Sequence, residues 1–146
     1  MSTVTEGLTL WPVAEPTTPL PAVLAYSTTS PCEIKLAFMN AGLRETFDYS
    51  FDRDLLADAL IADADQIVGV GTVQARQGEP LDYLVLRLWQ DDGTGGGEWW
   101  ELLVSQKRIE EIVQQIYALV PMGAERELLT AQLDTALAAI LSEAAR

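Results

Sequence analysis

Residues 47–60, FDYSFDRDLLADAL, change abruptly from the periodicity of a strand to that of a helix. Three aromatic residues, the last of them Phe51, alternate with polar ones, which predicts a strand with one buried and one wet face. The leucines and alanines that follow fall three and four positions apart, which predicts a short amphipathic helix. Asp52 can cap the first turn of that helix, and Asp54 complements its positive end. A strand leading directly into a helix is thus the local unit of this fold.

Similar patterns on both sides of this unit predict six more strands. Four prolines between Pro12 and Pro21 predict that the first strand is short or lies at an edge of its sheet, because proline donates no hydrogen bond. Asn40-Ala41-Gly42 predicts a hairpin connection, and residues 77–80 predict a turn. The remaining strands are predicted at residues 20–27, 32–38, 67–75, 82–90 and 99–104.

The last part of the chain is predicted to form two helices. Apolar residues hold helical spacing over residues 109–117 and again over 129–141, and Val120-Pro121-Met122-Gly123 separates the two segments. The order strands, helix, strands, two helices is typical of an α+β fold with two antiparallel sheets, in a single domain over residues 1–146. We expect residues 1–7 to be flexible and the glycine-rich residues 91–97 to form a mobile loop.

The composition argues against several classes of function. Asp and Glu number 22 against 9 Lys and Arg, and a net charge of −13 disfavours binding to nucleic acid or to anionic membranes. The chain has no histidine, so imidazole-based catalysis and imidazole zinc sites are excluded. One cysteine allows no internal disulfide, which fits a reducing, cytoplasmic compartment. No export signal is apparent, and the longest apolar run is far shorter than the roughly 20 residues of a membrane span.

The candidate catalytic, cofactor-binding and metal-ligating residues have simpler interpretations. Gly69-Val70-Gly71 lacks the third glycine and the following helix of a dinucleotide fingerprint, so it favours a bend or bulge in a strand. Asp54 and Asp58 are typical of the wet side of an amphipathic helix rather than of a metal site. Cys32 begins the inward face of a strand, where free cysteine behaves as a small apolar group. We therefore expect no catalytic site, no cofactor and no metal, and we predict that the protein is not an enzyme.

The tryptophans give the strongest indication of a binding surface. Trp89 is separated by the glycine-rich loop from Trp99 and Trp100, and neighbouring residues of a strand point to opposite faces of a sheet. Both faces of this hairpin are therefore apolar. The second face requires cover either from the terminal helices or from another subunit or partner, and the sequence leaves these two alternatives open.

Several short motifs, in one order along the chain, resemble the SsgA-like sporulation and cell-division family of actinobacteria. Residues 51–60 resemble the family's phenylalanine followed by Arg-Asp-Leu-Leu at the start of the first helix. Residues 120–125, VPMGAE, resemble its Val-Pro-Pro-Gly-Thr-Glu, and residues 133–141 resemble its closing Leu-Asp-Thr-Glu-Leu and Ile-Leu. Shorter matches are Leu24-Ala25-Tyr26 with Ser30-Pro31, Gly71-Thr72-Val73 and Gly97-Glu98. The departures from the family pattern are Ala59, Met122, the loop at 91–97 and Trp99-Trp100.

The resemblance implies a fold like that of the whirly-type nucleic-acid-binding proteins, assembled as a trimer around the helices. It also implies a non-catalytic role in division, since the SsgB-like branch helps to localise the tubulin-like GTPase FtsZ at future septa. We expect a cytoplasmic adaptor that is recruited to septa, with FtsZ or another division protein as its partner. The alternative is a single-stranded nucleic-acid-binding protein, which rests on the fold analogy and the aromatic strands and which the net charge opposes.

The residues that carry the resemblance have mainly structural interpretations. The first helix docks on the sheet, Arg53 pairs with a carboxylate, and a helix break follows near residue 121. Leu133, Leu137 and Leu141 form a helical stripe that belongs either to the core or to a trimer seam. The family-motif residues are Phe51, Arg53, Asp54, Leu55, Leu56, Pro121, Gly123, Leu133, Asp134 and Leu137. The residues proposed for an oligomer or partner interface are Trp89, Trp99, Trp100, Leu137 and Leu141.

Overall fold

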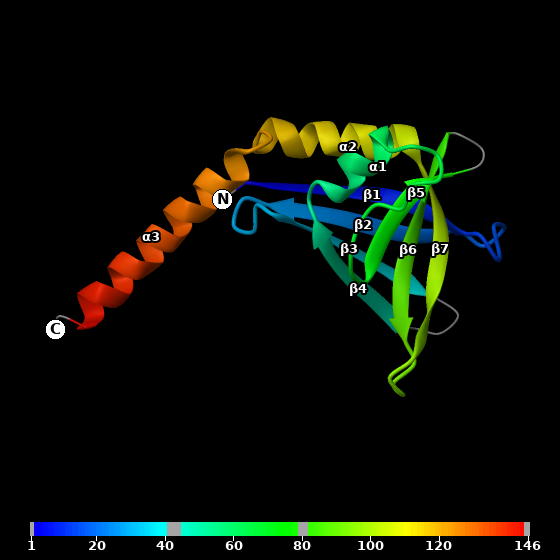
Figure 1. Ribbon diagram of the computed structural model, residues 1–146, viewed down its shortest axis with the longest axis horizontal. Helices are drawn as coiled ribbons and strands as arrows, with labels where there is room; N and C mark the ends of the chain where they lie inside the picture. Colours follow the sequence, from blue (N-terminus) through cyan, green and yellow to red (C-terminus); the bar gives the residue numbers. More distant parts are fainter. Residues whose placement is uncertain (1, 41–44, 79–81, 145–146) are drawn as a thin grey trace.

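A computed structural model describes residues 2–40, 45–78 and 82–144, which form an α+β domain of seven strands and three helices. The predicted order of strands, helix, strands and two helices is confirmed (Figure 1). The strands are β1 (Thr3–Pro12), β2 (Leu20–Ser27), β3 (Glu33–Asn40), β4 (Glu45–Asp52), β5 (Val73–Gln77), β6 (Tyr83–Asp91) and β7 (Gly97–Ser105). The helices are α1 (Leu55–Ile61), α2 (Gln106–Leu119) and α3 (Ala124–Ala144).

The strands form one curled antiparallel sheet rather than the two sheets expected from the sequence. Its order is β4-β3-β2-β1-β7-β6-β5. The first strand joins the two halves, because Thr3–Leu10 pairs with β2 whereas Trp11 and Pro12 pair with Leu103 and Leu102 of β7. The sequence pattern identifies each strand but does not reveal that one strand is long enough to belong to both halves.

The expectations for the N-terminal part of the chain were wrong. β1 is ten residues long and lies in the middle of the sheet, and residues 3–7, expected to be flexible, pair with residues 23–27 of β2. The prolines do not prevent this arrangement, because Pro12 ends β1 and the next two lie in the loop before β2. Threonines and Glu6 occupy much of β1, so the alternation of apolar and polar residues is visible in the sequence only at Leu8 and Leu10, which are buried.

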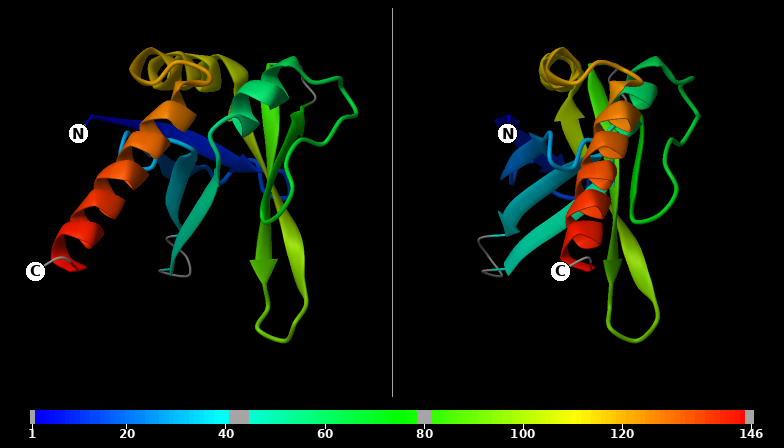
Figure 2. Two further views of the ribbon diagram at one scale, coloured as in Figure 1. Left: turned by 60° about the vertical axis from the view of Figure 1, so that its left-hand side comes forward. Right: turned by 90° about the vertical axis from the view of Figure 1, so that its left-hand side faces the viewer.

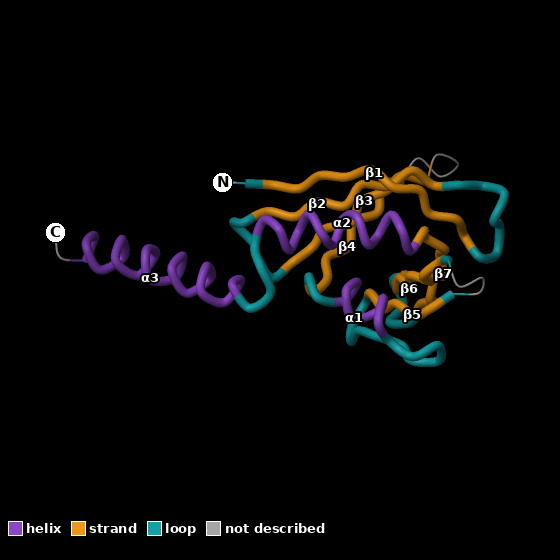
Figure 3. The backbone as a smooth tube through the Cα atoms, turned by 90° about the horizontal axis from the view of Figure 1, so that it is seen from above, coloured by secondary structure: helices purple, strands orange, loops and turns teal. Residues whose placement is uncertain are grey.

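The inner face of the sheet and the first two helices share one core. The predicted inward positions Ile34, Leu36 and Phe38 of β3 are buried, and Phe51 of β4 is buried beside them. α2 lies along the concave side of the sheet with α1 beside it (Figure 3), and its buried face contributes four residues to the core. The predicted hairpin turn at residues 40–42 and the turn at 77–80 lie largely outside the described residues.

Two local predictions need correction. The strand expected at residues 67–75 is β5, which begins only at Val73; before it the chain turns through Gly69 and Gly71, whose φ angles are +107° and +112°. Val68 and Ala75 exchange two backbone hydrogen bonds of 2.8 and 2.9 Å across this turn. Cys32 precedes β3 and is exposed, so it does not begin the inward face of the strand.

The glycine-rich segment connects β6 to β7 as a hairpin. Asp91 accepts a hydrogen bond from the Gly93 amide, and Asp92 accepts one from the Thr94 amide, each at 2.8 Å. These bonds define the turn, while the mobility of this loop stays a prediction. Among the described residues, no helix is both long and apolar enough to cross a membrane.

Candidate interaction surfaces

α3 extends away from the body of the protein, and none of its residues is buried (Figures 1 and 2). At about 1.5 Å per residue, its 21 residues make a helix of about 31 Å. Five large apolar side chains lie on it at helical spacing, each between 40% and 68% exposed. We call this set the α3 stripe: Leu129, Leu133, Leu137, Ile140 and Leu141.

The α3 stripe answers a question that the sequence left open. A helical apolar stripe can pack in the core of its own domain or against another chain, and the two cases have the same pattern. Here Leu133, Leu137 and Leu141 contribute nothing to the described core, and Asp134 is exposed beside them. The stripe is therefore available to another molecule.

A buried arginine fixes the base of α3. Arg53 lies between β4 and α1 and is only 2% exposed. One terminal nitrogen, Nη1, donates to the carbonyl oxygen of Val120 at 2.6 Å, and the other, Nη2, donates to that of Pro121 at 3.0 Å. Nη2 also pairs with the carboxylate of Glu125 at 3.0 Å, which supplies the acidic partner expected for Arg53. We call residues 120–123, which connect α2 to α3, the elbow. Arg53 holds the elbow in place between these two helices.

Two tyrosines complete the surroundings of the Arg53 guanidinium. The ring of Tyr117 lies 4.6 Å from its central carbon, and the Tyr26 hydroxyl accepts a hydrogen bond from Nη1 at 3.2 Å. The Tyr117 hydroxyl donates to Asp54 at 2.6 Å. Burial, followed by the hydrogen bond to Asp54, raises the pKa of Tyr117 well above its ordinary value. The hydroxyl therefore stays protonated and continues to hold Asp54 against α2.

Sequence reasoning missed both tyrosines, because their role depends on contacts between distant elements. Several other motif residues lie in α1 and in the elbow. Leu55 and Leu56 are buried on the inward face of α1. The predicted cap is not confirmed, because Asp54 is the N-cap residue and no side chain caps the first turn; Asp52 accepts the Asp54 amide at 2.8 Å ahead of the helix. Pro121 and Gly123 form the break, where Gly123 has a φ of +87° that favours glycine. The motifs around residue 53 and around residue 121 thus meet at one place.

The three clustered tryptophans divide between the two faces of the sheet. Trp100 points inward and contacts Phe38 and Phe47, with ring centroids 5.6 Å apart in both cases. Trp89 and Trp99 pair on the other face, edge to face at 5.3 Å. We therefore limit the candidate partner surface on this hairpin to Trp89 and Trp99.

The outer face around this pair carries two arginines that share one glutamate. Arg87 lies over the Trp99 ring at 4.6 Å, and Glu101 pairs with Arg76 at 3.1 Å and with Arg87 at 3.7 Å. α2 covers the inner face, whereas α3 does not reach the outer one. The sequence left open whether a terminal helix or another molecule covers the second face of the hairpin. A terminal helix covers the inner face, and it does not cover the outer face.

Comparison with known proteins places these features in a family. The family model for SsgA, the Streptomyces sporulation and cell division protein, matches residues 20–125. The fold is similar to that of an SsgA-like sporulation-specific cell division protein from Thermobifida fusca, with a TM-score of 0.74 and 24% identity over 92% of this chain and 94% of the other.

A structure of SsgB from Streptomyces coelicolor, in which mutations correlate to longitudinal cell division during sporulation, matches with a TM-score of 0.68. Its sequence is 27% identical over 87% of this chain and 95% of the other. No curated protein gives a significant match. The family match covers most of the chain and includes both motifs that meet at Arg53, so this chain belongs to the SsgA family of sporulation and cell division proteins.

Proposed function

We propose that this protein is a non-catalytic adaptor of cell division and sporulation that assembles as a homo-oligomer through α3. A trimer with a whirly-like protomer fold is the assembly we favour. It would act in the cytoplasm, be recruited to septa, and help to localise or regulate septum assembly through FtsZ or another division protein.

The observation that carries this proposal is the exposed α3 stripe on a helix whose base is fixed. Burying one leucine or isoleucine side chain contributes about 1.5–3 kcal/mol, so the five exposed side chains of the α3 stripe favour association. Large apolar patches are rare on monomers and mark interaction sites. Since Arg53 and Glu125 hold the elbow, α3 loses little freedom when it associates.

An oligomer would also explain how a small domain binds a polymer. Several copies of a weak site, held in one assembly, bind a repetitive partner far more tightly than one copy does. Trp89 and Trp99 form the surface we favour for that contact, because aromatic side chains are enriched where partners bind.

Nucleic-acid binding receives no support from the four arginines that form ion pairs in the described part of the chain. Arg53, Arg76, Arg87 and Arg108 are all paired with carboxylates. They therefore form no basic surface that would attract phosphate.

Light scattering after gel filtration tests the assembly. We expect a discrete oligomer for the wild type and a monomer for the double variant Leu133→Ser, Leu137→Ser. The matched control is Ala131→Ser with Ala138→Ser, which changes the opposite side of α3 and should leave the oligomer intact. A wild-type monomer at about 100 μM, well above the micromolar range of a stable assembly, would contradict the proposal.

Co-sedimentation with FtsZ polymers, with and without GTP, tests the partner. We expect pelleting that depends on GTP, weaker pelleting for the monomeric α3 variant, and weaker pelleting for Trp99→Ala despite an intact oligomer. If the wild-type oligomer stays in the supernatant while the polymers pellet, FtsZ is not the partner.

A further inference from the structure

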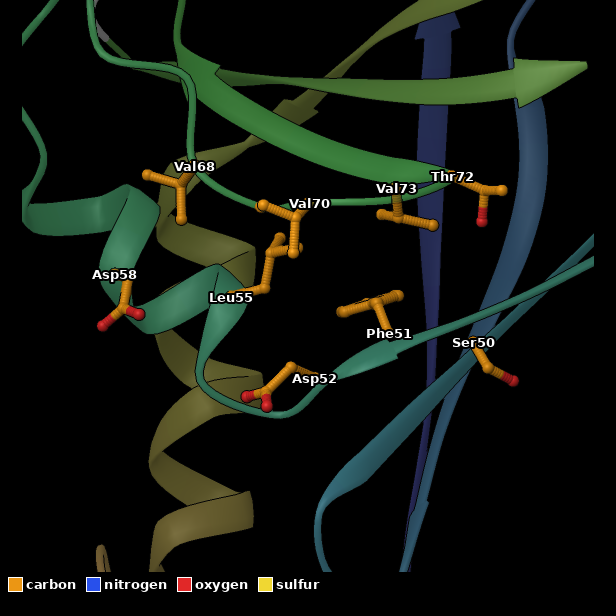
Figure 4. A pocket seen from close by; sticks show the side chains of 10 residues that line it. Ser50, Phe51, Asp52, Leu55, Asp58, Val68, Val70, Thr72 and Val73 are labelled. Atoms are coloured by element: carbon orange, nitrogen blue, oxygen red, sulfur yellow. The ribbon is translucent and has the colours of Figure 1, made fainter.

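A small apolar pocket opens at the end of the seam between β4 and β5, away from α3 and from the tryptophan pair. Its volume is about 280 Å³, and β4, the first turn of α1 and the turn before β5 form its walls. Figure 4 shows Phe51, Leu55 and Val70 around this space, with Asp52 and Asp58 on the side of α1. None of the surfaces considered above includes this pocket.

The wall of the pocket that carries Val70 packs closely against the rest of the domain. A Cβ atom on Gly69 would lie 2.7 Å from the Val73 carbonyl oxygen and 2.8 Å from Cδ1 of Leu55, so only glycine permits this approach. The adjacent Val70 is nonetheless 98% exposed at the rim of the pocket. Exposing a valine contributes nothing to folding, since burial is what stabilises an apolar side chain. Its position is explained if an apolar group from another molecule packs beside it.

The polar side of the pocket carries negative charge without a partner. Among the described residues, neither Asp52 nor Asp58 forms an ion pair. Burial, and then the charges of Asp54 and Asp52, raise the pKa of Asp58. Ionisation of Asp58 is thus less favourable here than in water, and a cation at the rim would offset this cost.

The floor of the pocket favours an apolar side chain as its occupant. Small-molecule sites usually have volumes of about 300–1,000 Å³ and several convergent polar groups. At about 280 Å³ this pocket lies at the lower end of that range, and its floor consists of Phe51, Leu55 and Val73, which are buried apolar residues. A leucine or phenylalanine side chain matches such a floor.

We propose that this pocket anchors a segment of a partner protein in which an apolar side chain is flanked by lysine or arginine. The apolar side chain lies between Phe51, Leu55 and Val70, and the basic residue pairs with Asp52 or Asp58 at the rim. This inference does not depend on the oligomer or on FtsZ.

Amide chemical shifts in the wild-type protein test the inference with the peptide Ser-Gly-Lys-Leu-Lys-Gly-Ser. We expect saturable shifts confined to residues 50–58 and 68–73, with a Kd of about 0.1–1 mM, typical of one anchoring side chain. Replacing the leucine by alanine, or both lysines by glutamate, should weaken binding about tenfold or more. No shift at about 5 mM peptide, or equal binding of the three peptides, would overturn the proposal.

Two variants of the protein locate the site. Val70→Asp should weaken binding of the leucine peptide about tenfold, whereas Val13→Asp, which changes an exposed valine elsewhere, should not. Asp58→Asn should lower the affinity and flatten its dependence on salt. If the peptide binds Val70→Asp as tightly as the wild type, the pocket is not its site. If the same residues shift on dilution of the peptide-free protein, a second copy fills the pocket and the proposal is wrong.

Discussion

Replacing Arg53 by methionine should destabilise the protein more than any change to a surface arginine. Methionine keeps an apolar stem of similar length beside Tyr117 but removes the guanidinium. The carbonyl oxygens of Val120 and Pro121 then lose their donor, and Glu125 loses its cation. Removing one partner of a buried charge pair costs about 3–5 kcal/mol, which is a large part of the roughly 5–15 kcal/mol that stabilises a domain.

Urea unfolding followed by tryptophan fluorescence measures this cost, with every variant at one protein concentration because oligomers gain stability by mass action. We expect Arg53→Met to lower the free energy of unfolding by about 3–5 kcal/mol and the melting temperature by about 10 °C. Glu125→Gln still accepts a hydrogen bond, so it should cost only about 1–1.5 kcal/mol.

The matched control is Arg76→Met, which removes an arginine that is paired with Glu101 at the surface. Exposed ion pairs contribute less than about 1 kcal/mol, so this variant should remain close to the wild type. If Arg53→Met costs no more than Arg76→Met, the elbow does not depend on Arg53. The same result would remove the reason for regarding α3 as pre-oriented.

The remaining predictions concern the core, the turn before β5 and pH. Trp100→Ala should cost about 3 kcal/mol of unfolding free energy because it empties space against two core rings, and Trp99→Ala should cost clearly less; urea unfolding compares them. Gly71→Ala should cost about 1 kcal/mol, from its positive φ alone, whereas Gly69→Ala should cost more because its Cβ also meets Val73 and Leu55. Asp58→Asn should raise the melting temperature at pH 7. The native state holds the Asp58 proton more tightly than the unfolded state, so ionisation costs stability as pH rises, and the gain should vanish below about pH 4. If the gain in melting temperature instead grows as the pH falls, the direction assigned to the pKa shift of Asp58 is wrong.

The sequence predicted elements well where one face of an element is buried. The bounds of β2 are those expected, and the inward residues of β3 and β4 follow from their alternation, since a slip by one residue would expose every apolar side chain. Predictions failed where neighbours, not periodicity, decide the structure. β1 is central because other strands pair along both of its ends, and the residues before Val73 leave the sheet because two glycines with positive φ turn the chain.

The α3 stripe shows that periodicity also does not predict which apolar residues are free to bind another molecule. Its spacing predicted a helix that carries an apolar stripe, and these side chains lie exposed on α3. Whether it packs inside the domain depends on the direction in which α3 leaves the elbow, which no local pattern encodes. That direction is held by Arg53 from one motif and by Val120, Pro121 and Glu125 from another, about 70 residues apart. The two motifs that reveal the family therefore contact each other at the elbow. We infer that this contact directs α3 outward, so that the α3 stripe remains free for another chain.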